Sequence, residues 1–153
     1  MFSRIKRLFS RGQQHTLQAK KPETVEELEE KIAAQFPADY KNFLKQIEKD
    51  QPALHGGPWL VHNFHHLASE NSYDDLYRNY LIALGEIPKQ LFPVAHDPGG
   101  NLYCIAVKGE HRGKIFLIDH EQELDGNSPF PSDEICLVAD DINEFLVVTT
   151  NDF

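Results

Sequence analysis

The chain lacks long apolar runs, a cysteine framework and an apolar leader. No stretch approaches the roughly 20 apolar residues of a membrane-spanning helix; residues 145–148 are a typical short run. Two cysteines, Cys104 and Cys136, give no disulfide framework. The first residues are basic, but no apolar segment of a secretory signal follows them. These absences favour a cytoplasmic protein, and 153 residues suffice for one domain with its own core.

Signatures of catalysis are also scarce. There is no G-x-G-x-x-G segment and no Walker-type phosphate loop. No residue pattern indicates a nucleophile with its oxyanion hole. We therefore predict that the chain is not an enzyme, and that it binds no cofactor and no resident metal.

Positive charge is rare outside the first residues. Six of the 15 basic residues lie in residues 1–22, which contain no acid. Residues 23–153 therefore carry nine basic residues against 24 acidic ones, a formal charge of −15. A body this acidic should repel nucleic acid and attract basic partners, although solubility alone is an alternative explanation.

The same asymmetry divides the chain into a basic flexible tail, residues 1–22, and a single domain, residues 23–153. Phe2, Ile5, Leu8 and Phe9 can share one helical face, opposite the basic residues. Such a helix would make weak contact with a membrane surface. The alternative is a basic tail without fixed structure.

The first half of the body has helical periodicity. Thr24 and Glu27 have the spacing of a capping box, and Pro37 suits the first turn of a second helix. The second helix places Tyr40, Phe43, Leu44 and Ile47 on one apolar stripe. A third helix is predicted over residues 73–84, with Ser72 as its cap and Gly85 at its end.

The second half has extended character. Strands are predicted over residues 59–64, 92–95, 101–108, 114–119 and 135–138, and the Pro-Gly order after Asp97 predicts a type II turn. Asp141 with Glu144 can cap a closing helix. The fold class is therefore α+β, in the order α-α-β-α-β-β-β-β-α, with helices packed on an antiparallel sheet.

Four segments, in matching order, resemble conserved segments of the SUKH superfamily. They are residues 36–44 (FPADYKNFL), 92–103 (FPVAHDPGGNLY), 116–121 (FLIDHE) and 137–146 (LVADDINEFL). The superfamily includes a yeast cell-wall-assembly regulator domain and many bacterial immunity proteins. The resemblance spans residues 24–148 and implies the same α+β fold.

The resemblance implies one of two protein-binding functions. The first is an immunity protein that neutralises a cognate bacterial toxin, such as a nuclease, by protein–protein contact. The second is a regulatory or scaffold module that associates with a membrane through its basic tail. A basic toxin would be steered onto the acidic body. The predicted contact residues are acids and an aromatic near loop ends: Trp59, Asp74, Asp75, Asp97, Asp119, Glu121, Glu123 and Asp125.

Three other groups of residues suggest metal binding or catalysis as alternatives to protein binding. His55, His62, His65 and His66 suit a metal by residue type, but their spacing does not define a ligand geometry. Cys104 could be a nucleophile, but alternation in its strand favours a small buried side chain. His96 with Asp97 could serve a hydrolase, which is the third functional hypothesis.

Overall fold

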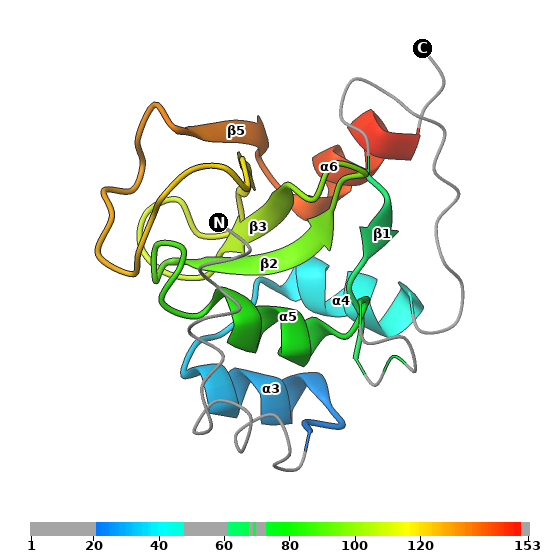
Figure 1. The fold of residues 1–153 in the computed structure, drawn as a ribbon. Coiled ribbons are helices and arrows are strands. Elements are labelled where there is room, and N and C mark those ends of the chain that lie inside the picture. Colours follow the sequence, from blue (N-terminus) through cyan, green and yellow to red (C-terminus); the bar gives the residue numbers. More distant parts are fainter. Residues whose placement is uncertain (1–20, 48–60, 68, 70–72, 151–153) are drawn as a thin grey trace.

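The computed structural model describes residues 21–47, 61–67, 69 and 73–150. Its element order matches the predicted one, and Figure 1 shows the arrangement. The elements are α3 (Val25–Ile32), α4 (Ala38–Ile47), β1 (Asn63–Phe64), α5 (Leu76–Ala83), β2 (Leu91–His96), β3 (Leu102–Ala106), β4 (Ile115–Ile118), β5 (Ile135–Ala139) and α6 (Ile142–Thr150). The predicted α+β class is confirmed.

The helix starts follow local hydrogen bonding. The Thr24 hydroxyl accepts the Glu27 amide at 3.1 Å, as the capping box predicts. The Glu27 carboxylate accepts the amide of Glu23 rather than that of Thr24. In α6, Asp141 accepts the Glu144 amide at 2.8 Å, which confirms the predicted cap.

Helix α5 begins later than the sequence predicts. Its N-cap is Asp75, whose carboxylate accepts the Tyr77 amide, and not Ser72, which lies outside the described residues. The reason is a long-range bridge: the His66 amide donates to Asp74, and the Leu76 amide donates to His66. This pairing holds residues 74–75 extended, so the helix starts at Leu76. Leu84, predicted on the buried face, is 51% exposed because the helix ends at Ala83.

The five strands form one antiparallel meander in the order β1-β2-β3-β4-β5. His96 pairs with Leu102, Leu102 with Ile118, and Ile118 with Ile135. The C-terminal ends of β2 and β4 therefore lie at the same end of the sheet. The starts of β2 and β4 lie at the other end, where Leu91 pairs with Ala106 and Ile105 with Ile115.

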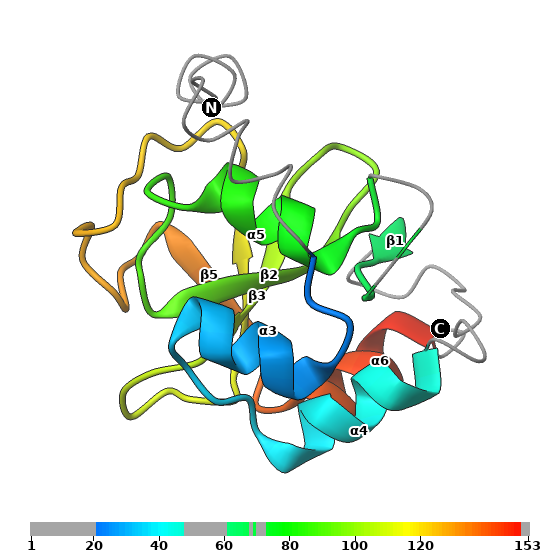
Figure 2. The ribbon, with the colours of Figure 1, turned by 90° about the horizontal axis from the view of Figure 1, so that it is seen from below.

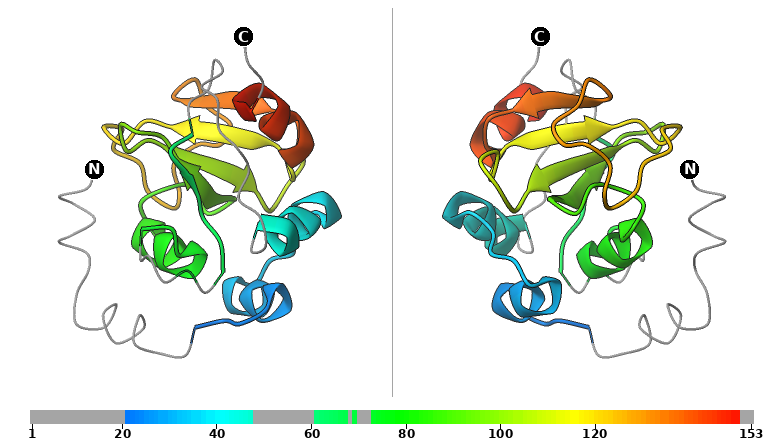
Figure 3. Two further views of the ribbon diagram at one scale, coloured as in Figure 1. Left: turned by 90° about the vertical axis from the view of Figure 1, so that its right-hand side faces the viewer. Right: turned by 90° about the vertical axis from the view of Figure 1, so that its left-hand side faces the viewer.

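Both faces of the central strand are buried, by different parts of the chain. Tyr103 and Ile105 join the core formed with the helices, whereas Leu102, Cys104 and Ala106 join a second cluster. Figures 2 and 3 show α3, α4 and α5 together on one side of the strands. The second cluster is closed by the loop that joins β4 to β5, which contributes Leu124 and Phe130.

The turn after β2 is not of the predicted type. The Gly100 amide donates to the Asp97 carbonyl, which closes a four-residue turn. A type II turn requires positive φ at its third residue, here Gly99, but the positive value of 90° belongs to Gly100. The left-handed residue therefore lies at the return into β3, where glycine carries no Cβ penalty.

Candidate functional site

Carboxylates gather where β2 and β4 finish and β5 starts. The register places Asp97, Asp119 and Glu134 directly beyond those strand ends. Asp74 and Glu121 lie close to them, as the contacts below show. We call these five residues the acidic end. The residues directly flanking the strands there include no lysine or arginine among the residues that the structure describes.

Asn101 joins the two turns of the acidic end. Its backbone and side-chain amides donate to the two oxygens of the Asp97 carboxylate, both at 2.8 Å. Its side-chain oxygen accepts the His120 amide at 3.0 Å and lies 2.8 Å from the His120 Nδ1, which must carry the proton. One side chain thus connects the turn after β2 to the turn after β4.

The turn after β4 presents its acids outward. The Asp119 carboxylate accepts the Glu121 amide at 2.8 Å, which is a local side-chain turn. The Asp119 side chain remains 55% exposed, and Glu121 is exposed beside it. The backbone of this turn is therefore ordered by hydrogen bonds, while its negative charge faces solvent.

Asp74, which precedes the N-cap of α5, also lies near the C-terminal end of β2. Its carboxylate accepts the Asn63 side-chain amide at 2.6 Å, and Asn63 pairs with His96 across the sheet. Burial, and then the neighbouring His62, lower the pKa of His96, whereas Asp74 and Asp97 act in the opposite direction. Both carboxylates thus lie close enough to influence the His96 ring.

Of the described residues of the predicted metal cluster, only His65 is buried, and its ring pairs with His96, which is not part of that cluster; His62 is exposed and His66 is half-buried. The His65 Nε2 lies 3.1 Å from the His96 Nδ1, so one ring donates to the other. Burial lowers the pKa of His65 to about 3, so the ring is neutral at physiological pH. Within the described ranges, no three His, Cys, Asp or Glu side chains are placed to hold a metal ion. His55 lies outside those ranges.

The predicted contact residues do not all lie together. Asp74, Asp97, Asp119 and Glu121 share the acidic end. Asp75 is only 1% exposed, because it caps α5 and pairs with Lys21; its burial gives it a structural role. Trp59 lies outside the described residues. The exposed Glu123 and Asp125 lie farther along the β4–β5 loop, and Asp125 precedes Gly126, which accepts the Lys89 amide at the other end of the sheet.

The side chains that were considered for a catalytic role are buried or hydrogen-bonded within the fold. Cys104 is fully buried, and burial raises the pKa of its thiol. Asp97 accepts from Asn101 with both oxygens, and no hydrogen bond between described residues joins its carboxylate to the His96 ring. These contacts support structural roles for Cys104 and Asp97.

Sequence reasoning missed the residues that organise the acidic end. Asn101, His120 and Asn63 were not among the predicted contacts, yet Asn101 hydrogen-bonds to Asp97, Asn63 hydrogen-bonds to Asp74, and the His120 Nδ1 lies 3.8 Å from the Asp119 carboxylate. The positions of Asn101 after Gly100 and of His120 after Asp119 are typical of ordinary turns, and Asn63 lies in a strand, where nothing local marks it. Only the register shows that two turns, 19 residues apart, meet through one asparagine.

The fold and the acidic end define an antiparallel meander covered by helices, with a charged surface at the strand ends. The chain belongs to the SMI1 / KNR4 family (SUKH-1), whose model matches residues 21–147. It is also 29% identical over 148 residues to the SPbeta prophage-derived uncharacterized protein YokK of Bacillus subtilis (strain 168), covering 81% of this chain and 71% of that protein. No solved structure matches the chain significantly.

The helices of the described residues are short. In the described ranges, the longest helix is α4, with 10 residues. A helix needs about 20 residues to span a bilayer. No helix of the described residues is therefore long and apolar enough to cross a membrane.

Proposed function

We propose that this chain is an immunity protein that binds a cognate bacterial toxin through its acidic end and thereby neutralises it. Three lines of support combine: membership of the SUKH-1 family, a relative that is prophage-derived, and the gathered carboxylates. The carboxylates carry the argument. Asp97, Asp119 and Glu134 follow or precede three different strands, so a rigid sheet sets their spacing.

A nuclease is the toxin class that fits this surface best. Its substrate site must be basic because it holds phosphates. An acidic surface is steered onto such a site, which speeds association, and it then occludes the site. Nuclease–immunity pairs reach dissociation constants of about 10⁻¹³–10⁻¹⁶ M, so stoichiometric neutralisation is physically feasible. The proposal needs no catalytic group, cofactor or nucleic acid partner.

The preformed turns contribute to affinity. The hydrogen bonds of Asn101 order the acidic end before any partner arrives, so less conformational entropy is lost on binding. An exposed ion pair contributes only about 0–1 kcal/mol. Several carboxylates in a fixed arrangement are therefore needed, together with apolar contact, to make tight binding.

Co-expression tests the proposal. The toxin to use is the one encoded next to this chain in its native genome, produced from an inducible promoter in sensitive cells. We expect survival when this chain is present, and a stable one-to-one complex of the purified proteins. The variant that tests the surface carries Glu121→Lys and Glu134→Lys, which reverses charge without removing any hydrogen bond given above and should lose rescue. Full rescue by that variant would contradict the proposed surface, and absence of rescue by the natural chain would contradict the function.

The regulatory alternative stays a prediction. It depends on residues 1–22 reaching a membrane surface, and residues 1–20 lie outside the described residues. Deleting residues 1–20, which keeps Lys21 and its ion pair with Asp75, separates the two functions: toxin neutralisation should survive the deletion, whereas membrane association should be lost.

A further inference from the structure

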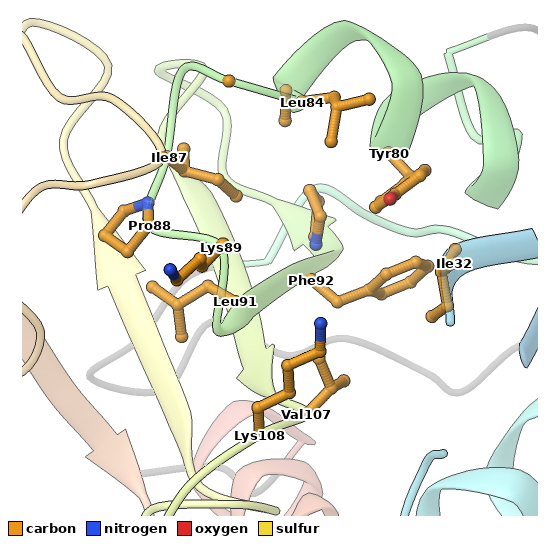
Figure 4. A pocket seen from close by; sticks show the side chains of 14 residues that line it. Ile32, Tyr80, Leu84, Ile87, Pro88, Lys89, Leu91, Phe92, Val107 and Lys108 are labelled. Atoms are coloured by element: carbon orange, nitrogen blue, oxygen red, sulfur yellow. The ribbon is translucent and has the colours of Figure 1, made fainter. Parts of the chain in front are cut away.

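A pocket of about 330 Å³ opens at the end of the sheet opposite the acidic end. Its walls are apolar side chains from α3, α5, the loop between α5 and β2, the start of β2 and the residue that follows β3. The residues that form these walls are Ile32, Tyr80, Ala83, Leu84, Ile87, Leu91, Phe92 and Val107. Figure 4 shows these side chains around the cavity.

The pocket is built from segments whose positions are fixed by the core. Phe92 is 1% exposed, and the Tyr80 ring stacks on it with centroids 5.3 Å apart and planes at 21°. The backbone of β2 continues outward through Gln90, whose carbonyl accepts the Val107 amide at 2.8 Å. The walls are therefore held by aromatic stacking and by the strand ladder.

Only positive charge lines this pocket. Lys89 and Lys108 are exposed, and Figure 4 shows both across the cavity from Leu84 and Tyr80 of the α5 side. Neither ammonium group forms an ion pair with another described residue, and no acid is among the lining residues. The neighbouring Asp125 uses its carboxylate to accept the Asn127 amide at 2.7 Å.

This arrangement is unusual for a body with nine basic residues against 24 acidic ones. In such a body, two lysines that have no ion-pair partner among the described residues, beside an apolar cavity, favour an anion with an apolar body. Water inside an apolar cavity has few hydrogen-bond partners, so its displacement by apolar groups is favourable. The volume lies at the lower limit of ligand pockets, about 300–1,000 Å³, and so fits one short chain.

We propose that this pocket binds a small single-chain amphiphilic carboxylate of the medium-chain fatty acid class. The apolar chain lies between Ile32, Leu84 and Phe92, and the carboxylate lies between the Lys89 and Lys108 ammonium groups. The proposal does not depend on toxin binding, because the pocket and the acidic end lie at opposite ends of the sheet.

The test is titration of the full chain with decanoate, and with decanol as the uncharged counterpart, followed by calorimetry and by amide NMR shifts. Decanoate should bind saturably below its aggregation concentration and shift the amides of Leu84, Lys89 and Val107. Decanol should bind more weakly, because it lacks the charge. Lys89→Gln with Lys108→Gln should weaken decanoate about three- to tenfold, since each exposed ion pair is worth up to about 1 kcal/mol.

Matched variants distinguish decanoate binding in the pocket from nonspecific binding elsewhere on the surface. Leu84→Ser removes an apolar wall that is 51% exposed, and Leu137→Ser is its control, because Leu137 is 49% exposed and does not line the pocket. Lys45→Gln on α4 is the control for the lysines. Leu84→Ser should weaken decanoate, and both controls should leave binding unchanged.

Several results would overturn the proposal. They are the absence of saturable decanoate binding, equal affinity for decanol, and unchanged affinity in the double lysine variant. Binding only to vesicles of anionic lipid would assign the lysines to a membrane surface instead. Binding only to an acidic peptide would assign the pocket to a protein partner.

Discussion

At one end of the sheet three strands adjoin carboxylates, whereas at the other end the neighbouring side chains are mostly cationic. Asp97, Asp119 and Glu134 flank the first end directly, and turns joined by Asn101 hold them. The second end has Lys89 and Lys108 beside an apolar pocket, and Lys114, which pairs with Asp140 at 3.7 Å. We call Lys89, Lys108 and Lys114 the lysine end.

The two ends differ in surface charge, but they share one buried core. Both ends depend on the same buried residues of the central strand, such as Tyr103 and Ile105. Burying one such side chain contributes about 1.5–3 kcal/mol, which is more than any exposed ion pair supplies. The charged ends can therefore differ without a cost to folding. Under the two proposals above, the acidic end binds a basic toxin and the lysine end binds a small anion.

The largest expected effect is on the stability of the whole domain at acid pH, and it arises at His65, whose ring contacts that of His96 at the end of β2. His65 has a pKa of about 3 in the folded chain against 6.5 for the free side chain. Below pH 6.5 the unfolded chain binds a proton that the folded chain excludes. Stability is therefore fully present above about pH 6.5 and falls as the pH drops toward 3, by about 1.4 kcal/mol per pH unit. Urea denaturation at several pH values measures this slope.

Two variants test whether the buried His65 ring causes this dependence of stability on pH. His65→Leu should flatten the pH dependence, because the protonation difference is removed. His62→Gln, at an exposed position of the same cluster, should retain most of it. An equal slope in the natural chain and in His65→Leu would show that other groups cause the acid lability.

The next effect concerns the asparagine that joins the two turns. Asn101→Ala removes the side-chain contacts to Asp97 and His120, leaving partly buried polar groups without their partner. We expect a loss of about 2–3 kcal/mol in the free energy of unfolding. Faster amide exchange should be confined to the turns after β2 and β4. Faster exchange around Lys89 and Lys108 instead would show that the two ends are not independent.

A third effect is kinetic. Glu121→Lys with Glu134→Lys reverses two charges at the acidic end. At low salt, association with the cognate toxin should slow about tenfold, and the natural chain should approach the same rate as salt rises. Glu26→Lys with Glu30→Lys makes the same charge change on the exposed face of α3. If this control slows association equally, net charge rather than the acidic end controls the rate.

The smallest effect lies at the lysine end. Gly113 has φ of +96°, and a Cβ there would lie 3.4 Å from Pro37. Gly113→Ala should cost about 1 kcal/mol in unfolding free energy, because the left-handed conformation is strained for alanine. Gly126→Ala is the control, since its φ is not positive and nothing lies within 4 Å of the added Cβ. Equal stabilities of the two variants would contradict this account of Gly113.

Much of the fold was predictable because periodicity reports burial. The stripe of Tyr40, Phe43, Leu44 and Ile47 is buried, and Cys104 is a small buried side chain, as the alternation in its strand predicts. Such patterns are local, and each residue's face follows from the geometry of its own element.

Long-range pairing was not predictable in the same way. The start of α5 depends on the bridge between His66 and Asp75, and those residues give no local sign of it. The meeting of Asp97 with the turn of Asp119 depends on register across three strands. The pocket combines side chains from α3, α5, the loop between α5 and β2, the start of β2 and the residue that follows β3. Asp74, Asp97, Asp119 and Glu121 were therefore predicted as candidates, whereas Glu134 was not. The grouping of these five acids, and the separation of Asp125 from them, required the structure.

The most direct test of the central claim is amide hydrogen exchange of this chain, free and bound to its cognate toxin. We expect protection on binding at residues 97–101 and 119–122, with exchange around Lys89 and Lys108 unchanged. Protection confined to the lysine end, with the acidic end exchanging as in the free chain, would contradict the claim that the acidic end binds the toxin.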